Sequence, residues 1–174
     1  KMFQELGVDC YISDIEAKKL MNTSKVIKRK IIENFGTKSY NSKGLNRSYL
    51  AEIVFQDSHK LNILNSIVHP RVHNHFKKFV KKSKSAYVIY ESAILFENNG
   101  HKNCNYVITV VAPIELRIQR IIDRDNTTKV DILNRMKNQF SDKEKIESDS
   151  DLDNLRTYGE YRSWIESLDA EEKE

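Results

Sequence analysis

The first part of the chain alternates between one short apolar stretch and runs of helical spacing. Gly7 suits a residue that closes a helix, Asp14 follows the apolar stretch, and Ser24 and Gly36 suit a helix N-cap and a helix stop. The pattern predicts, in order, the last turns of a helix over 1–7, a short buried strand over 8–13, and helices over 15–20 and 24–35.

The pattern stays helical up to residue 80, apart from polar connectors. Asp57 or Ser58 suits the N-cap of a long helix, which we expect to be interrupted near His69-Pro70 because proline cannot donate a backbone hydrogen bond. The predicted elements are a turn region over 38–46, a helix over 49–55, an interrupted helix over 58–80 and a solvated connector over 81–85.

Two compact apolar runs predict strands at 86–90 and 106–111. The first run ends at Glu91, and the second ends at Ala112-Pro113, where proline can open a helix. Near-continuous apolar strands, each followed by helical periodicity, are typical of a parallel sheet that is covered on both faces. The predicted fold class is therefore α/β.

Helical spacing dominates the chain after Pro113. Asn126 to Thr128 breaks the periodicity and predicts the end of one helix and the start of another. The predicted elements are helices over 113–122 and 130–140, the start of a last helix at 149–155, and an exposed acidic tail over 170–174.

Composition narrows the class of protein. The 174 residues are 39% hydrophobic, enough for one ordinary core, so we expect one domain. The net charge of +4 suits anionic ligands but is too small to indicate a nucleic-acid protein. Cys10 and Cys104 are too far apart for a Cys-x-x-Cys site, and they favour a reducing compartment. With no signal peptide and no apolar run of membrane length, we expect a cytoplasmic protein without a membrane partner.

Asp14 and Glu91 both follow predicted strands. Ligands of open parallel sheets bind outside the carboxyl ends of the strands, so these two carboxylates are predicted to share the ligand-binding rim. A carboxylate there can accept a proton from an attacking hydroxyl or help to hold Mg²⁺ through water, as phosphoryl transfer requires. The alternative is that such a residue caps the helix after the strand.

Arginines concentrate near the predicted break after residue 125. Arg117, Arg120 and Arg124 share one helix face, and Arg135 lies on the next helix. Such a set can bind phosphate oxygens from a segment that closes over a nucleotide. From spacing alone, a solvated face paired with acidic neighbours is the better interpretation; those neighbours are Glu115, Asp123 and Asp125.

The histidines do not predict a metal site. His69 and His73 are one turn apart, but Pro70 intervenes, no cysteine is near, and no glutamate stands beside His69 as in zinc proteases. His69 can contact a phosphate, and the other four histidines are expected at the surface; they are His59, His73, His75 and His101. The chain contains neither a glycine-rich phosphate loop nor a nucleophile elbow.

Taken together, several groups of residues resemble the landmarks of the dephospho-CoA kinase family, from Lys1 to about Glu147. Each group alone is a weak signal, but the whole set in this order is specific. The groups are Gly44-Leu45-Asn46-Arg47, Leu50 with Val54-Phe55, His69-Pro70, Glu91 with Leu95-Phe96-Glu97, and Arg120 to Asp125 with Arg135 and Gln139.

The resemblance implies a three-layer P-loop kinase fold. Residues 1–23 and 83–174 would form the kinase core, 24–82 a helical CoA-binding insertion, and 117–139 a helical lid. The implied reaction transfers the γ-phosphoryl group of ATP to the ribose 3′-hydroxyl of dephospho-CoA, with Mg²⁺, as the last step of coenzyme A biosynthesis.

The resemblance also implies a role for each matching residue. Asp14 matches the second aspartate of the family's Asp-x-Asp and would be the catalytic base, whereas Ile12 stands where the first aspartate is usual. Arginines would bind the ATP phosphates and the transition state, which reverses the preference drawn from spacing; they are Arg117, Arg120, Arg124 and Arg135. The dephospho-CoA site would include His69, Glu91, Leu95, Phe96 and Glu97.

Two departures from the family are apparent. The family's first strand and P-loop would precede Lys1, and residues 145–149 run almost directly to Asp151, where the family usually has a further strand. A kinase without the P-loop is expected to be inactive, because the loop supplies most of the phosphate positioning. The alternatives are therefore an incomplete sequence of an active enzyme and a truncated, non-catalytic module that binds CoA or a nucleotide.

A third possibility is a small basic nucleic-acid binder. It would use the lysines at 77, 78, 81, 82 and 84, but the sequence shows no recognition motif beside them. We expect dephospho-CoA and ATP as partners, no nucleic acid, and a monomer or weak homo-oligomer.

Overall fold

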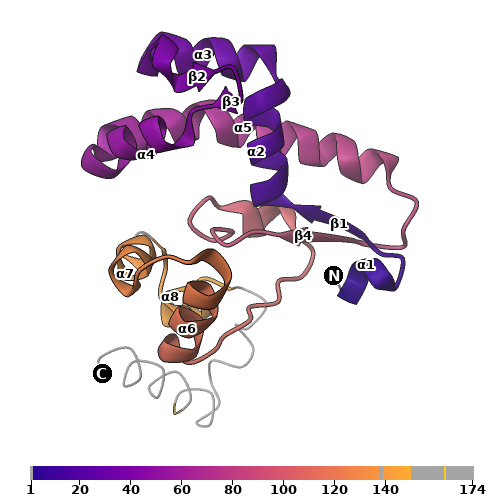
Figure 1. Ribbon diagram of the computed structural model, residues 1–174. Coiled ribbons are helices and arrows are strands. Elements are labelled where there is room, and N and C mark those ends of the chain that lie inside the picture. The colour runs from indigo at the N-terminus through magenta and orange to yellow at the C-terminus, as the bar shows by residue number, and fades with distance from the viewer. Residues whose placement is uncertain (1, 138, 150–162, 164–174) are drawn as a thin grey trace. The chain divides into compact units, whose positions relative to one another are not determined.

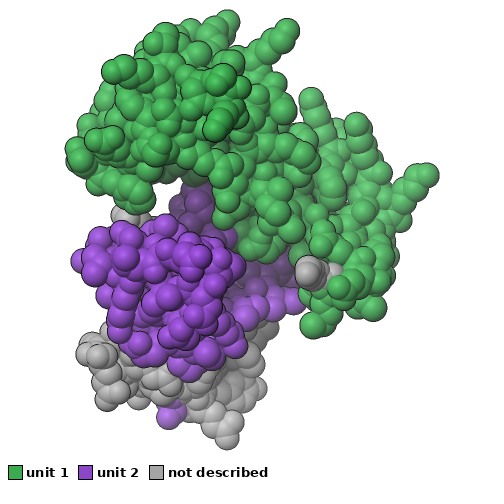
Figure 2. Space-filling model, viewed as in Figure 1, with its two compact units in different colours: residues 1–92 green, residues 93–174 purple. Residues whose placement is uncertain are grey.

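The computed structural model describes residues 2–137, 139–149 and 163 of the chain. It divides the chain into two compact units, residues 1–92 and residues 93–174 (Figure 2). Composition alone predicts one domain, and the structure adds a division at Ser92. The predicted boundaries of a kinase core, an insertion and a lid remain predictions.

The first unit combines a parallel pair of strands, a short hairpin and a series of helices (Figure 1). The interval 38–46, predicted only as a turn region, contains the hairpin and overlaps a 3₁₀ turn at Thr37–Ser39. In chain order the elements are α1 (Met2–Glu5), β1 (Asp9–Ile12), α2 (Ser13–Thr23), α3 (Lys25–Phe35), β2 (Tyr40–Asn41), β3 (Gly44–Leu45), α4 (Arg47–Gln56), α5 (Ser58–Lys82) and β4 (Val88–Glu91).

β1 and β4 pair in parallel, which confirms the predicted α/β class. Asp9 lies opposite Val88 and Ile12 lies opposite Glu91. A parallel pair needs a long crossover connection, and here the helices from α2 to α5 supply it. The carboxyl ends of both strands therefore meet at one edge of the sheet.

The helix boundaries follow from local chemistry. The Ser24 hydroxyl accepts a hydrogen bond from the Ile27 backbone N–H at the start of α3, and Gly36 ends that helix with a φ of 85°, a conformation that glycine adopts without strain. The Asp57 carboxylate accepts hydrogen bonds from the backbone N–H groups of His59 and Lys60 at the start of α5. These are the caps that the sequence predicts.

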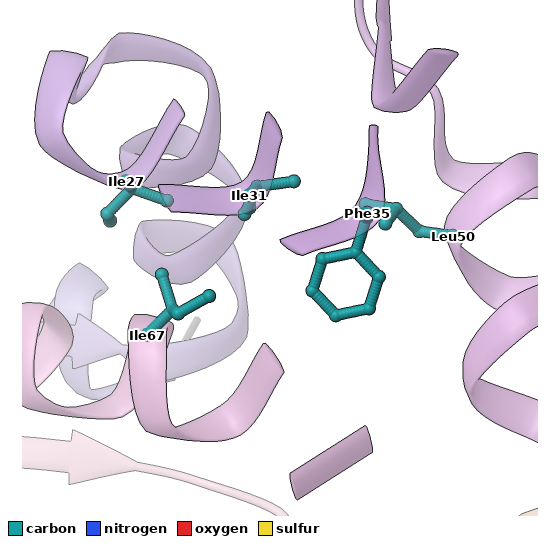
Figure 3. Close-up of a cluster of buried hydrophobic side chains, with 5 residues drawn as sticks. All are labelled: Ile27, Ile31, Phe35, Leu50 and Ile67. Atoms are coloured by element: carbon teal, nitrogen blue, oxygen red, sulfur yellow. The ribbon is translucent and has the colours of Figure 1, made fainter. Parts of the chain in front are cut away.

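One hydrophobic core joins α3, α4 and α5 (Figure 3). Ile27, Ile31 and Phe35 recur every four residues along α3 and lie on one side of that helix, facing Leu50 of α4 and Ile67 of α5. Ile27 and Ile31 have no exposed surface. The regular spacing in the sequence therefore becomes a buried stripe.

Truncating Ile31 tests this core. We expect Ile31→Ala to lower the free energy of unfolding by about 3 kcal/mol, because the lost side chain leaves a cavity among packed neighbours. Ile15→Ala is the matched control, since the Ile15 side chain is 53% exposed, and it should cost less than about 1 kcal/mol. Urea unfolding followed by circular dichroism measures both; equal losses would show that the Ile31 site is not tightly packed.

α5 runs through Pro70 without a break, so the predicted interruption at His69-Pro70 is wrong. Val68 and Val72, on either side of the proline, are both buried against Tyr11 of β1. This packing stabilises one long helix despite the backbone donor that proline lacks.

The second unit is helical in the part that the structure describes. A 3₁₀ turn at Gly100–Asn103 precedes α6 (Ile114–Asp125), α7 (Lys129–Met136) and α8 (Asp142–Glu147). The break after α6 is confirmed, with Asn126 in the left-handed conformation and Thr128 as the N-cap of α7. The sequence analysis missed α8 and extended α7 to Phe140; its predicted helix start at 149–155 and acidic tail lie almost entirely outside the described residues.

The predicted strand over 106–111 is wrong. These residues form no regular element, and Tyr106, Ile108 and Val110 are at least 79% exposed. Apolar composition predicts that a stretch can enter a sheet, but a strand also needs a neighbouring edge to bond to. Among the described residues, only β1 with β4 and β2 with β3 form such pairs.

Candidate active site

Asp14 and Glu91 lie at the edge of the sheet where β1 and β4 end. Glu91 is the last residue of β4 and lies opposite Ile12, while Asp14 is the second residue of α2, which begins directly after β1. A hydrogen bond of 3.3 Å from the Tyr90 hydroxyl to the Ser13 hydroxyl ties the residues that precede the two carboxylates. The predicted juxtaposition of Asp14 and Glu91 is confirmed.

The Asp14 carboxylate does not cap α2. The N-cap position belongs to Ile12, which makes no side-chain capping bond. Asp14 is exposed, and within the described part of the chain it has no hydrogen-bond or ion-pair partner. The first turn of a helix still favours a negative charge there. Asp14 is therefore a charged group that is available to a ligand.

The two carboxylates influence each other electrostatically. Burial raises the pKa of Glu91 above the ordinary glutamate value, and the negative charge of Asp14 raises it further. Glu91 therefore keeps a proton to a higher pH than an isolated glutamate. This edge of the sheet can accept a proton, donate one or attract a cation.

Removing the Asp14 charge should lower the pKa of Glu91. In an Asp14→Asn variant the repulsion between the two carboxylates disappears, so the charged form of Glu91 becomes easier to reach. Burial is the larger cause and remains, so the pKa should stay above the ordinary value. An NMR titration of the Glu91 carboxyl carbon measures this; an unchanged or higher pKa would show that the two groups do not interact.

His69 lies within α5 and is half-buried. Burial lowers the pKa of its imidazole, so the ring is neutral over more of the pH range than a free histidine. A neutral imidazole can donate or accept a hydrogen bond but attracts phosphate less than a charged one does. Together with Asp14 and Glu91, it belongs to the first unit.

The Leu95-Phe96-Glu97 segment belongs to the second unit, where internal contacts fix two of its side chains. Phe96 is buried and stacks on His101, with 5.0 Å between the ring centroids. The Glu97 carboxylate accepts a 2.7 Å hydrogen bond from the backbone N–H of Phe140, in the connection between α7 and α8. Both side chains therefore take part in contacts that stabilise the second unit.

The four predicted arginines differ in their surroundings. Arg117 forms a two-pronged ion pair with buried Asp142, at 3.2 and 3.1 Å, which ties α6 to α8. Arg124 binds the adjacent Asp125 carboxylate at 2.7 and 2.9 Å. Arg120 and Arg135 are exposed, and neither has a hydrogen-bond or ion-pair partner in the described residues.

This arrangement only partly matches the solvated-face alternative. Asp125 does pair with an arginine, but Glu115 binds Lys129 and Asp123 accepts a hydrogen bond from Gln119. Acidic neighbours therefore neutralise part of the arginine set and leave two guanidinium groups open to an anion.

The sequence analysis missed a polar cluster behind the strand ends. His75, which was expected at the surface, is half-buried and lies 3.0 Å from the Tyr11 hydroxyl and 3.7 Å from a Glu16 carboxylate oxygen. A signal was present, because His75 shares a helix face with Val68 and Val72 through the spacing i, i+4, i+7.

No described helix is long and apolar enough to cross a membrane. Among the described residues, no group of three or more histidine, cysteine, aspartate or glutamate side chains is arranged to hold a metal ion.

Sequence comparisons point to one family. A family model described as Dephospho-CoA kinase matches residues 1–158. A dephospho-CoA kinase of Bacteroides fragilis is 35% identical over 147 residues, which are 84% of this chain and 72% of the relative. A dephospho-CoA kinase of Fusobacterium nucleatum is 32% identical over 163 residues, covering 89% of this chain and 84% of the relative.

Comparison with solved structures agrees. The crystal structure of TT1252 from Thermus thermophilus matches with a TM-score of 0.71 and 25% identity, over 85% of this chain and 75% of that one. A dephospho-CoA kinase from Campylobacter jejuni matches with a TM-score of 0.57 and 25% identity, over 86% of this chain and 76% of that one.

Proposed function

The chain belongs to the dephospho-CoA kinase family, and from this premise we propose that it transfers the γ-phosphoryl group of ATP to the ribose 3′-hydroxyl of dephospho-CoA. Its α/β fold is that of the P-loop kinases, and the family places it among the transferases of coenzyme A biosynthesis. The observation that carries the proposal is the unpartnered Asp14 carboxylate at the carboxyl end of β1, beside Glu91.

Asp14 is the proposed catalytic base. Phosphoryl transfer needs a group that orients the attacking hydroxyl and accepts its proton, and a carboxylate free of internal partners can do both. Glu91 is the proposed neighbour that contacts the substrate ribose. Its raised pKa means that it keeps a proton, and so can donate a hydrogen bond, to a higher pH than an isolated glutamate does. Ile12 contributes no carboxylate, so this chain relies on Asp14 for the base.

Arg120 and Arg135 are the proposed ligands of the ATP phosphates. Both guanidinium groups are exposed and form no hydrogen bond or contact ion pair in the described residues, although Arg135 interacts electrostatically with Asp131; an anion can therefore bind them without breaking a contact ion pair. Arg124 would exchange Asp125 for a phosphate oxygen. Arg117 remains part of the proposed lid over 117–139, where its ion pair with Asp142 supports α6.

The dephospho-CoA site is proposed to involve His69, Glu91 and the Leu95-Phe96-Glu97 segment, with residues 24–82 as the CoA-binding insertion. Leu95 offers an apolar side chain, while Phe96 and Glu97 hold the segment in place through His101 and Phe140. We also propose that the enzyme acts in the cytoplasm, as its cysteine content favours.

Mg²⁺ fits the proposed site as a companion of ATP. Proteins bind Mg²⁺ through one or two carboxylates together with substrate phosphates and water, without needing a complete protein cage. Asp14 and Glu91 offer such a pair, and their mutual repulsion favours a nearby cation. When bound, Mg²⁺ neutralises charge on the phosphates.

The direct test is the reaction of the intact natural protein with dephospho-CoA and ATP, followed by mass spectrometry. We expect ATP-dependent formation of coenzyme A and no comparable reaction with nucleoside monophosphates, which other kinases of this fold phosphorylate. Binding of dephospho-CoA without turnover would replace the proposal by the non-catalytic module. The matched relatives give that alternative no support, since they are named as kinases.

A further inference from the structure

We propose that His75 is a positioning residue that holds the corner between β1 and α2, and thereby fixes the place of Asp14. The inference rests on the proposed function, in which Asp14 is the base. Its basis is a contact between α5 and two residues on either side of Asp14, Tyr11 three residues before it and Glu16 two residues after it. Tyr11 lies in β1, next to its last residue, and Glu16 lies in the first turn of α2.

Both flanking residues approach the same atom of His75. The Nδ1 atom of His75 lies 3.0 Å from the Tyr11 hydroxyl and 3.7 Å from Oε2 of Glu16. The other carboxylate oxygen of Glu16 binds Lys19 at 3.1 Å, which leaves Oε2 to face the imidazole. In Figure 1, α2 starts where β1 ends and crosses α5, against which it packs. One side chain of α5 therefore contacts the chain on both sides of Asp14.

The direction of each hydrogen bond follows from which of the groups carries a proton. Burial raises the pKa of Tyr11 strongly, so its hydroxyl keeps its proton, and it donates that proton to the backbone carbonyl of Val72 at 3.2 Å. The hydroxyl oxygen is then free to accept from an N–H at Nδ1 of His75. A proton on Nδ1 also suits the Glu16 carboxylate, which would repel an unprotonated nitrogen lone pair. The three groups form one consistent chain of donors and acceptors.

The surroundings fix the Tyr11 side of this contact, whereas the His75 side chain is 39% exposed. Tyr11 is 1% exposed, and its ring packs against Phe76, Phe79 and Tyr90 at centroid distances of 5.1, 5.4 and 5.7 Å. Tyr90 in turn donates to Ser13, the residue before Asp14. A buried hydrogen-bonded group with fixed neighbours holds its partners more precisely than an exposed one does. Loss of the His75 contact should therefore loosen the first turn of α2, which His75 contacts at Glu16, while Tyr11 and the rest of α5 stay packed.

Small displacements of a catalytic base have large kinetic effects. A shift of about 1 Å away from the reacting hydroxyl can cost about a hundredfold in rate. The His75 and Tyr11 variants leave the Asp14 carboxylate itself unchanged and alter only its position. We therefore expect His75→Leu and Tyr11→Phe each to lower kcat about tenfold, with KM for dephospho-CoA changed by less than about twofold.

His75→Asn is the decisive variant, because the asparagine amide nitrogen can occupy the place of Nδ1 and donate to Tyr11. It should recover most of the kcat that His75→Leu loses. The double variant Tyr11→Phe/His75→Leu should be no slower than His75→Leu alone, because His75→Leu already removes the contact with the Tyr11 hydroxyl. Gln4→Leu is the control: Gln4 is exposed in α1, outside the proposed insertion, lid and site residues, and its variant should keep kcat.

A second readout does not depend on turnover. If His75 holds Asp14 beside Glu91, His75→Leu should lower the pKa of Glu91, measured by NMR, relative to His75→Asn. Both variants lack the imidazole, so their difference reports the contact and not a lost charge. Thermal melts show which variants are folded, and Tyr11→Phe provides the test if a His75 variant does not fold.

The outcomes separate the two proposals. Unchanged kcat and unchanged Glu91 pKa in folded His75→Leu and Tyr11→Phe would overturn the role of His75 while the kinase assignment stands. Equal losses in His75→Leu and His75→Asn would also overturn it, because they would indicate a purely structural side chain. A wild-type protein without dephospho-CoA kinase activity would overturn the proposed function, and the Glu91 pKa would then decide on His75 alone.

Discussion

Asp14→Asn is expected to lower kcat for dephospho-CoA phosphorylation about a thousandfold while leaving the fold intact, because it removes a general base and keeps the shape of the side chain. Asp14 has no internal hydrogen bond or ion pair in the described residues that asparagine would break. The substrate is held by other groups, so KM should change by less than about threefold. Steady-state kinetics of the intact protein measure both constants.

The matched control for this prediction is Glu5→Gln, which makes the same change from carboxylate to amide on an exposed helix surface. Glu5 is exposed in α1, outside the proposed insertion and lid, and its variant should keep full activity. Undiminished turnover in Asp14→Asn would exclude Asp14 as the base. A fall in kcat accompanied by a lowered melting temperature would point to a structural role.

The sheet shows which strands an apolar pattern can predict and which it cannot. The stretches 8–13, 86–90 and 106–111 are similarly apolar, yet only the first two form ladder bonds in the structure. Hydrophobicity reports which residues gain from burial, whereas a strand also needs a partner edge, and the pattern of one stretch contains no information about its neighbour. Helices are easier to predict, because their hydrogen bonds and caps are local, as at Ser24 and Gly36.

Pro70 shows the opposite error, in which a local rule is too strong. Proline disfavours a helix interior by about 3 kcal/mol or more, and burial of the neighbours Val68 and Val72 offsets this cost. Tertiary packing keeps α5 continuous, and the His69-Pro70 sequence alone does not predict that packing. The single helix matters for the site, since it carries both His69 and His75.

The candidate site was predictable where topology alone brings residues together. Asp14 and Glu91 follow consecutive parallel strands, so the rule that such strands end at one edge was sufficient. The ion pair of Arg117 with Asp142 and the contact of Glu97 with Phe140 join segments that are far apart in sequence. No periodicity predicts those partners. These contacts separate the residues that match the family into two groups: those whose side chains are free to bind a ligand and those whose side chains are held by other parts of the protein.

That division gives the second large prediction. Arg120→Ala is expected to lower kcat about a thousandfold, because an unpaired guanidinium that stabilises a transferring phosphoryl group contributes at least that much in related reactions. Arg120→Lys should recover only part of the loss, since lysine keeps the charge but lacks the planar fork that binds two phosphate oxygens. Kinetics with varied ATP separate the effect on kcat from the effect on KM.

Lys102→Ala is the control for Arg120, because it removes an exposed cation outside the proposed insertion and lid, and it should leave kcat unchanged. Arg117→Ala makes the informative contrast. It should mainly lower the melting temperature, since it leaves the buried Asp142 carboxylate without its arginine partner and releases α6 from α8. If Arg120→Ala kept its turnover and Arg117→Ala lost it without unfolding, the phosphate ligand would be the ion-paired arginine, and exposure would be the wrong guide to which arginine binds ATP.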